Sequence, residues 1–241
     1  GGQMGDIGII TSPHCKIKVI NTMKYLGKVI GHVCELKEGL ISPGDEIKLE
    51  IDTNYRKNLR IHHTATHILH AVLRDVLGRH VTQKGSLVAQ DKLRFDISHP
   101  KALTKAEIHL IESKVNSIIS DNSKVNTKLM STDQAIESGA MALFGEKYDS
   151  EVRVVSLGAD LNVLNPHSFE LCGGTHAQRT GDIGAFKIIS EGAIAAGIRR
   201  IEAVCGNFAF ASILESEELL EQVMNSLKSN KTELLQKVDT L

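Results

Sequence analysis

Residues 62–78 read HHTATHILHAVLRDVLG and carry a clear helical pattern. Apolar residues recur at helical spacing from Ile68 to Leu77, and Gly78 is a suitable stop. His63 and His67 are four residues apart, which places them about 40° from each other around a helix and away from its apolar stripe. The pattern therefore predicts a helix with an apolar face for the core and a separate polar face that carries two histidines.

The residues before this helix have the pattern of short strands. Apolar runs at 8–10, 17–20, 28–34 and 46–51 alternate with turn residues such as those at 42–45. We expect residues 1–54 to form a small glycine-rich β-barrel or part of one. The polar stretch 52–58 marks the expected boundary to the next domain.

The residues after the helix mix strands with separate helices. Thr104 and Glu107 form a capping box that opens a helix to about Ser120, and a short helix is expected at 134–138. Strands are expected at 86–89, 93–97, 152–157, 168–171, 185–190 and 198–204. This order predicts an α+β fold for residues 55–207, with helices packed on a mostly antiparallel sheet. Residues 208–241 are expected to form a helical linker that is interrupted near Asn230.

Composition sets further bounds on the chain. It has 241 residues, of which 41% are hydrophobic, and a net charge of −1, so it can bury a core but is not broadly basic. An RNA partner would need a local basic patch. No apolar run reaches the length of a membrane span, and no secretion leader opens the sequence, so we expect a cytoplasmic protein without a membrane partner.

A second pair of possible metal ligands lies far along the chain, in Cys172-Gly-Gly-Thr-His176. Zinc prefers cysteine sulfur and histidine nitrogen in tetrahedral geometry, and the two glycines let the chain turn so that both side chains point at one spot. A solvated His-rich helix face and a buried free cysteine are the alternatives. Four ligands would close the site, whereas three would leave a place for water, and the sequence leaves this choice open.

Six motifs, in matching order, resemble the editing domain of alanyl-tRNA synthetases. They lie at His62–His67, Gln83–Ser86, Leu93–Asp96, Leu143–Lys147, Glu170–His176 and Gly197–Glu202. Residues 1–6, GGQMGD, resemble the glycine-rich barrel segment that precedes this domain. The resemblance covers residues 1 to about 210, and it identifies the chain as an editing-domain segment of this family with the start of a C-terminal helical linker.

The resemblance implies an aminoacyl-tRNA deacylase. The expected substrates are Ser-tRNA(Ala) and Gly-tRNA(Ala), and the expected cofactor is one zinc ion at His63, His67, Cys172 and His176. The parent enzyme would join alanine to tRNA(Ala) with ATP in a domain outside this chain, and a region after residue 241 would make a homo-oligomer. Alternatives are a free-standing editing protein that acts in trans and a non-catalytic, zinc-stabilised RNA-binding module. A metalloprotease-like site is not expected, because no glutamate lies between the two histidines.

Further site residues follow from the ester substrate, which needs an oriented water and a stabilised oxyanion. Gln83 is a candidate for positioning substrate or water. Thr66 is a candidate for bonding the hydroxyl of misattached serine, which would spare alanine, although it can instead bond within its own helix. The expected contacts to the tRNA acceptor end are Lys84, Arg94, Arg199 and Arg200, with Arg56, Lys57 and Arg60 as further cations, although each can also be ordinary surface charge.

Overall fold

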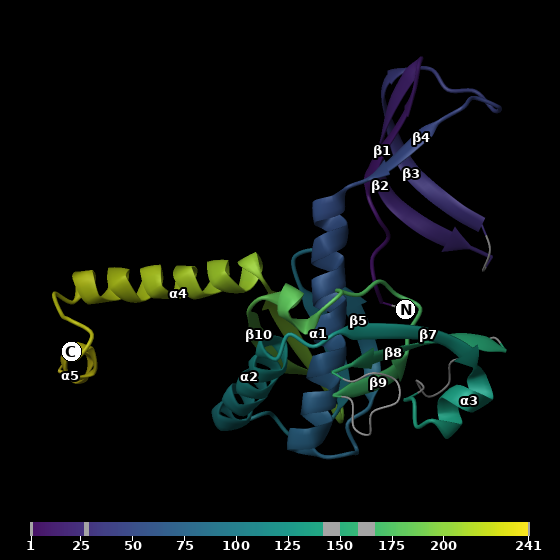
Figure 1. The fold of residues 1–241 in the computed structure, drawn as a ribbon. Coiled ribbons are helices and arrows are strands. Elements are labelled where there is room, and N and C mark those ends of the chain that lie inside the picture. The colour runs from purple at the N-terminus through teal and green to yellow at the C-terminus, as the bar shows by residue number, and fades with distance from the viewer. Residues whose placement is uncertain (1, 27–28, 142–149, 159–166, 241) are drawn as a thin grey trace.

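The protein is described here by a computed structural model that covers residues 2–26, 29–141, 150–158 and 167–240. Within these ranges the strands form three antiparallel sheets, and helices lie beside them (Figure 1). This confirms the α+β class predicted from the sequence. The division into domains at residues 54 and 207 stays a prediction.

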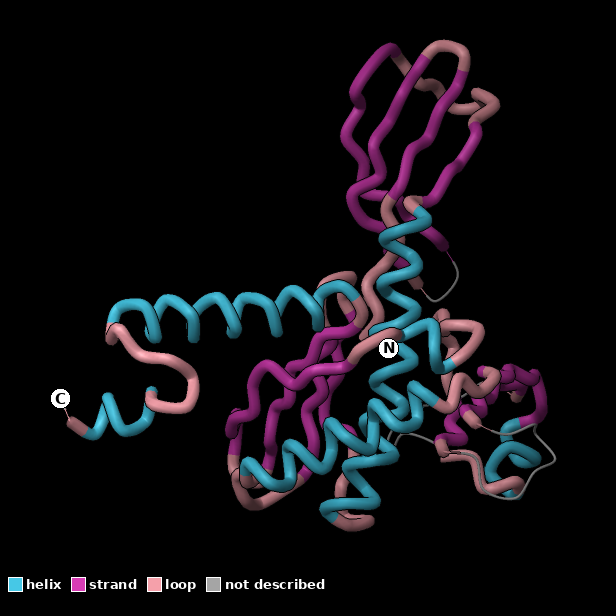
Figure 2. The backbone as a smooth tube through the Cα atoms, turned by 60° about the vertical axis from the view of Figure 1, so that its left-hand side comes forward, coloured by secondary structure: helices cyan, strands magenta, loops and turns pink. Residues whose placement is uncertain are grey.

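The first sheet contains the N-terminal strands β1 (Gly8–Ser12), β2 (Cys15–Tyr25), β3 (Val29–Gly39) and β4 (Lys48–Ile51). Its order is β3-β2-β1-β4, and every neighbouring pair is antiparallel. A small buried cluster of Ile10, Cys15, Ile17 and Val19 lies on one face. The sheet lies beyond the N-terminal end of α1 (Thr53–Leu77) (Figures 1 and 2). The closure of these strands into a barrel stays a prediction.

The second sheet carries the main core. Its strands are β5 (Gln83–Val88), β6 (Leu93–Ser98), β10 (Phe186–Ala195) and β11 (Ile198–Cys205), in the order β10-β11-β6-β5. Helices α1 and α2 (Lys105–Ser120) pack on it, and their apolar residues join those of the strands in one cluster that includes Leu69, Phe95, Ile111 and Ile201. The capping box predicted at Thr104 and Glu107 is present at the start of α2.

The third sheet has the order β7-β8-β9, with β7 at Val125–Ser131, β8 at Glu151–Leu157 and β9 at Ser168–Leu171. Helix α3 (Thr132–Glu137) follows β7, and a short 3-10 helix η1 (Thr180–Ile183) follows the loop after β9. The sequence analysis missed β7, whose residues are exposed or half-buried and show no alternating apolar pattern. Pairing with the apolar strand β8, from Val125 opposite Leu157 to Ser131 opposite Glu151, makes it a strand.

Helix α1 begins earlier than the sequence predicted, at Thr53, and has 25 residues. The stretch 52–58, which was expected to be a polar boundary, therefore forms the first turns of the helix. Asp52 caps it by accepting a hydrogen bond from the backbone N–H of Tyr55, while Tyr55 and Leu59 are buried. The two histidines consequently lie near the middle of a long helix and not at its start.

The C-terminal segment is helical, as predicted. Helix α4 (Asn207–Ser226) extends away from the sheets, and α5 (Leu234–Asp239) follows a turn (Figure 1). The side chain of Asn230 accepts hydrogen bonds from the backbone N–H groups of Thr232 and Glu233, which confirms the interruption expected there. Within the described ranges, no helix combines the length and apolar character needed to cross a membrane.

Candidate metal centre

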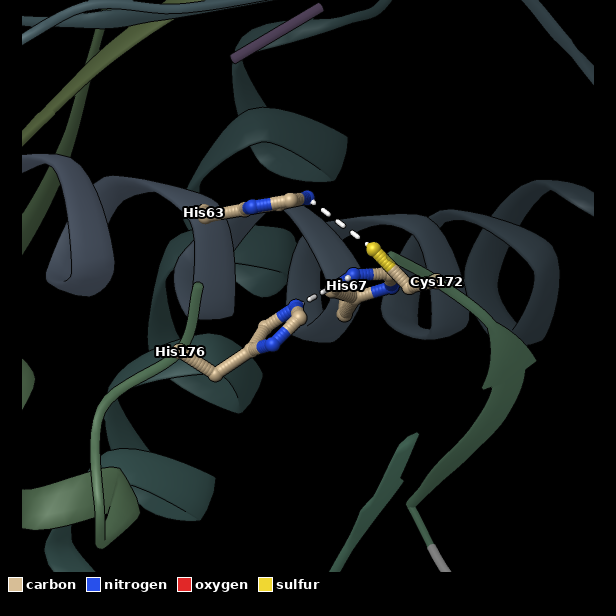
Figure 3. Close-up of side chains that lie close together, drawn as sticks. All are labelled: His63, His67, Cys172 and His176. Carbon is tan, nitrogen blue, oxygen red and sulfur yellow. Dashed lines mark hydrogen bonds between the residues drawn. The ribbon is translucent and has the colours of Figure 1, made fainter. Parts of the chain in front are cut away.

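Four side chains from two distant parts of the sequence converge on one point (Figure 3). His63 and His67 come from α1, while Cys172 and His176 come from the loop that follows β9. Their ligand atoms all lie within 4.8 Å of one another. The two pairs that the sequence analysis assigned to one zinc ion therefore form one cluster.

The donor set is compatible with zinc, and two of the donor separations are close to those of a zinc site. In a tetrahedral site with Zn–N of about 2.0–2.1 Å and Zn–S of about 2.3 Å, neighbouring donors lie roughly 3.3–3.8 Å apart. The Cys172 Sγ is 3.3 Å from His63 Nε2, and the Nε2 atoms of His67 and His176 are 3.2 Å apart. Three imidazoles and one thiolate are compatible with zinc, although the cluster by itself does not identify the ion.

Glu170 orients one of the imidazoles. Its carboxylate Oε2 lies 2.9 Å from His67 Nδ1, and its other oxygen accepts a hydrogen bond from Ser168 Oγ at 2.9 Å. His67 and His70 hold the pKa of Glu170 below its usual range despite burial, so the carboxylate is an acceptor only. His67 Nδ1 therefore carries a proton, and Nε2 is the nitrogen on the cluster side, which would bind a metal after releasing its own proton.

Gln3 orients the imidazole of His63, the other histidine of the cluster on α1. Its Oε1 lies 2.7 Å from His63 Nδ1 and also accepts the backbone N–H of Thr175 at 2.9 Å, while its Nε2 donates to Thr175 Oγ1 at 2.8 Å. The backbone donor fixes which end of the amide is oxygen, so His63 Nδ1 must donate and its Nε2 lone pair faces Cys172. The sequence analysis noted Gln3 only as part of a glycine-rich motif and missed this role.

The loop that carries Cys172 is held from both sides. Arg153 on β8 donates to the carbonyl oxygens of Cys172 and Gly174, and the Ala177 N–H donates to Thr64 Oγ1 on α1 at 2.9 Å. A Cβ on Gly174 would lie 2.0 Å from His63 Cε1, whereas a Cβ on Gly173 would meet nothing within 4 Å. Neither glycine has a positive φ. Gly174 is thus required for its small size, which lets the loop approach His63.

Charge in the cluster favours a thiolate. Burial lowers the pKa of His63, and it lowers that of His176 to about 4. Burial acts in the same direction on His67, but Glu170 and Cys172 raise the pKa of His67 to about 10. Burial alone would raise the pKa of the Cys172 thiol, but its contacts with His176, His63 and His67 hold the pKa far below its usual value. The thiolate is the form that binds metals.

The two residues expected to contact substrate have different surroundings. Thr66 is buried one residue before His67, and its hydroxyl donates to the carbonyl oxygen of His62 at 2.8 Å, so the helix-internal bond is present. Gln83 lies half-buried at the start of β5, opposite Ile97. Among the described residues, no hydrogen bond joins Gln83 to the cluster. Both roles stay predictions.

Most of the expected tRNA contacts are already paired with carboxylates. Arg200 makes two hydrogen bonds to Asp96, at 2.7 and 2.8 Å, and Arg199 pairs with Glu191. Arg94 Nε lies 3.8 Å from the same Asp96. Lys84 is exposed on β5.

The cluster of four side chains does not include one expected motif or the three remaining cysteines. The motif at 143–147 lies outside the described residues. The remaining cysteines, Cys15, Cys34 and Cys205, are free thiols, and within the described ranges none belongs to a group of metal-binding side chains.

Two known protein families match this chain, and both matched segments contain residues of the candidate metal centre. A family described as the threonyl and alanyl tRNA synthetase second additional domain matches residues 152–202, which include Cys172 and His176. A family described as class II (A) tRNA synthetases matches residues 1–55, which include Gln3.

Similar curated proteins are alanine–tRNA ligases. Identity is 63% over 241 residues with that of Rickettsia bellii, covering 100% of this chain and 27% of the relative. It is 63% over 239 residues with that of Rickettsia akari, covering 99% and 26%. The chain thus spans about a quarter of the length of these relatives. The resemblance noted in the sequence is confirmed along the whole chain.

Proposed function

We propose that this chain, which belongs to the alanyl-tRNA synthetase family along the segment it spans, hydrolyses Ser-tRNA(Ala) and Gly-tRNA(Ala) at a zinc site. The observation that carries the proposal is the convergence of His63, His67, Cys172 and His176 within 4.8 Å. Ligation of alanine to tRNA(Ala) with ATP is a proposal for the whole protein, and we assign no residue of this chain to it.

The protein's own residues prepare the donors. Gln3 and Glu170 each accept a hydrogen bond from an Nδ1–H group, which orients the Nε2 atoms of His63 and His67 toward the cluster. The surrounding histidines keep Cys172 in its thiolate form. Zinc, when bound, supplies either a water of lowered pKa or a Lewis acid that holds the ester. The general base for the attacking water is not assigned, and Gln83 is proposed to position the substrate or the water.

Thr66 is proposed to recognise the hydroxyl of serine. Its own proton is used by the His62 carbonyl oxygen, so Thr66 Oγ1 would accept a hydrogen bond from the seryl hydroxyl. Alanine has no donor there, and a buried acceptor left unpaired costs about 1–3 kcal/mol. Thr66→Val should slow the removal of serine, while Thr66→Ser should retain it. If Thr66→Val removed serine at the wild-type rate, Thr66 would not be the residue that recognises the seryl hydroxyl.

The experiment for the main proposal uses the purified chain with Ser-tRNA(Ala) and Ala-tRNA(Ala), each with and without a chelator. We expect loss of serine but not of alanine, and we expect chelation to stop it. Re-addition of zinc should restore the activity. Equal persistence of both esters beside the metal-loaded chain would contradict the proposal.

One observation favours the second candidate, a zinc-stabilised RNA-binding module without hydrolytic activity. All four donors converge, and a closed four-ligand site is typical of structural zinc. In that case the metal-loaded chain would bind tRNA, and chelation would unfold it, but neither ester would be hydrolysed. The same experiment therefore separates the two functions.

A further inference from the structure

A cavity of about 330 Å³ opens beside the first turns of α1. On one side lie Arg56, Lys57 and Arg60 from the helix, and on the other lie Gln178 and Asp182 from the chain that follows the metal-binding loop. The helical residues that line the cavity belong to the N-terminal half of α1, and the figure shows that this end of the helix lies next to the first sheet (Figure 1).

The cavity carries an excess of positive charge. Arg56 is neutralised by two contacts to Asp6. Asp182 is engaged by the backbone N–H groups of Gln178 and Arg179, through its Oδ2. Across the described chain, neither Lys57 nor Arg60 forms an ion pair. The positive charges of Lys57 and Arg60 are therefore balanced in the described cavity lining only by Asp182, whose carboxylate already accepts two backbone hydrogen bonds.

Arg60 also has an unsatisfied donor. Its Nε is buried without a hydrogen-bond partner among the described residues. A buried donor without a partner costs about 1–3 kcal/mol, and more when the group is charged. Arg60 lines the cavity, so an anion bound there would compensate the charge of its guanidinium, and the nearby N-terminus of α1 adds a favourable dipole.

The cavity and the metal cluster share a helix and a loop. Arg56, Arg60, His63 and His67 follow at spacings of four, three and four residues, so they lie along one face of α1. Arg60 precedes His63 by about 4.5 Å along the helix axis, and Lys57 precedes it by about 9 Å. On the loop side, Ala177 lines the cavity and directly follows His176. A ligand in the cavity would thus lie beside the cluster.

We propose that this cavity binds a backbone phosphate of the RNA near its acylated end, with Lys57 and Arg60 as the contacts. The proposal rests on the proposed function, because it supplies the anchor that presents the terminal ester to the cluster. It takes the place of Arg199 and Arg200 as the main expected contacts, since those side chains already pair with carboxylates.

The test is the binding of uncharged tRNA(Ala) to the chain at several salt concentrations. Each lost phosphate contact should reduce the slope of log affinity against log salt by about 0.7 in a single strand or about 0.9 in a duplex. Because Lys57 and Arg60 would contact one phosphate, Lys57→Gln with Arg60→Gln should weaken binding and lower the slope by about 0.7–0.9. The matched control is Lys105→Gln, an exposed lysine outside the cavity, which should leave the slope unchanged. Arg60→Lys should keep most of the affinity.

Hydrolysis gives a second readout that separates this proposal from the function on which it rests. The double variant should have a raised KM for Ser-tRNA(Ala) but wild-type activity on a 3′-seryl ester of adenosine, which has no phosphate. A wild-type slope and affinity in the double variant would overturn the cavity as a phosphate site, even if hydrolysis is normal. Absence of hydrolysis in the wild type would instead overturn the proposed function. The salt slope would still show whether the cavity binds a phosphate.

Discussion

The Nδ1 atom of His63 lies 2.7 Å from the side-chain oxygen of Gln3, although the two residues are sixty positions apart in the chain. The same oxygen accepts the backbone N–H of Thr175 in the metal-binding loop. One amide from the N-terminal segment therefore connects α1 to the loop and sets the tautomer of a ligand. The N-terminal segment is part of the candidate metal centre and not only a neighbour of it.

Replacing Gln3 should weaken metal binding without removing a ligand. Gln3→Leu removes the acceptor that holds the His63 proton on Nδ1, and the loss of such a partner typically reduces metal affinity about 10–100-fold. Gln3→Glu keeps an acceptor for both His63 and Thr175, so it should retain most of the affinity. The measurement is competition for zinc with a chromogenic chelator at constant pH. Equal zinc affinity of Gln3→Leu and the wild type would disprove the role.

The two glycines of the loop should respond differently to alanine. A Cβ on Gly174 would lie 2.0 Å from the ring of His63, whereas Gly173 has open space around it. Gly174→Ala should lower the free energy of unfolding by about 1–3 kcal/mol, as expected for overpacking, and should weaken zinc binding. Gly173→Ala is the matched control and should be close to neutral. Urea unfolding in excess zinc measures both, and equal effects would show that the close approach to His63 is not the cause.

Zinc should stabilise the fold through Cys172. A ligand present at 100 times its dissociation constant stabilises the native state by about 2.7 kcal/mol. We expect zinc to raise the thermal unfolding midpoint of the wild type and of Cys34→Ser, whose thiol is exposed and outside the cluster. Cys172→Ser should lose most of this shift. If zinc raised the unfolding midpoint of Cys172→Ser as much as that of the wild type, the stabilising ion would not be bound by Cys172.

The pair of Arg200 and Asp96 should contribute stability that depends on pH. Hydrogen bonding to Arg200 holds the pKa of Asp96 below its usual value of 3.8. The folded pKa is thus lower than the unfolded one, so the contribution is complete above about pH 5 and is lost as the pH falls through the folded value. Arg200→Gln should unfold at a lower urea concentration than the wild type at pH 7. This difference should narrow below pH 4, and a constant difference across this range would exclude the pair as its source.

Local signals in the sequence were sufficient for much of the fold. The capping box at Thr104, the break at Asn230 and the apolar spacing in α1 depend on residues a few positions apart. The prediction failed for β7 and for the first turns of α1. Strand β7 has no apolar alternation of its own and forms by pairing with β8. The first turns of α1 are stabilised by the Asp52 cap and by the burial of Tyr55.

The sequence by itself determined which side chains can bind a metal, because a four-residue spacing on a helix and the short Cys172–His176 loop each bring two donors together locally. Only the tertiary structure decided that these pairs meet, that Gln3 and Glu170 orient two of the imidazoles, and that Arg200 pairs with Asp96 while Arg60 keeps a buried N–H without a partner. The physical reason is that hydrogen bonds and ion pairs depend on distances of a few ångströms, and for residues far apart in sequence the packing of the whole chain sets those distances.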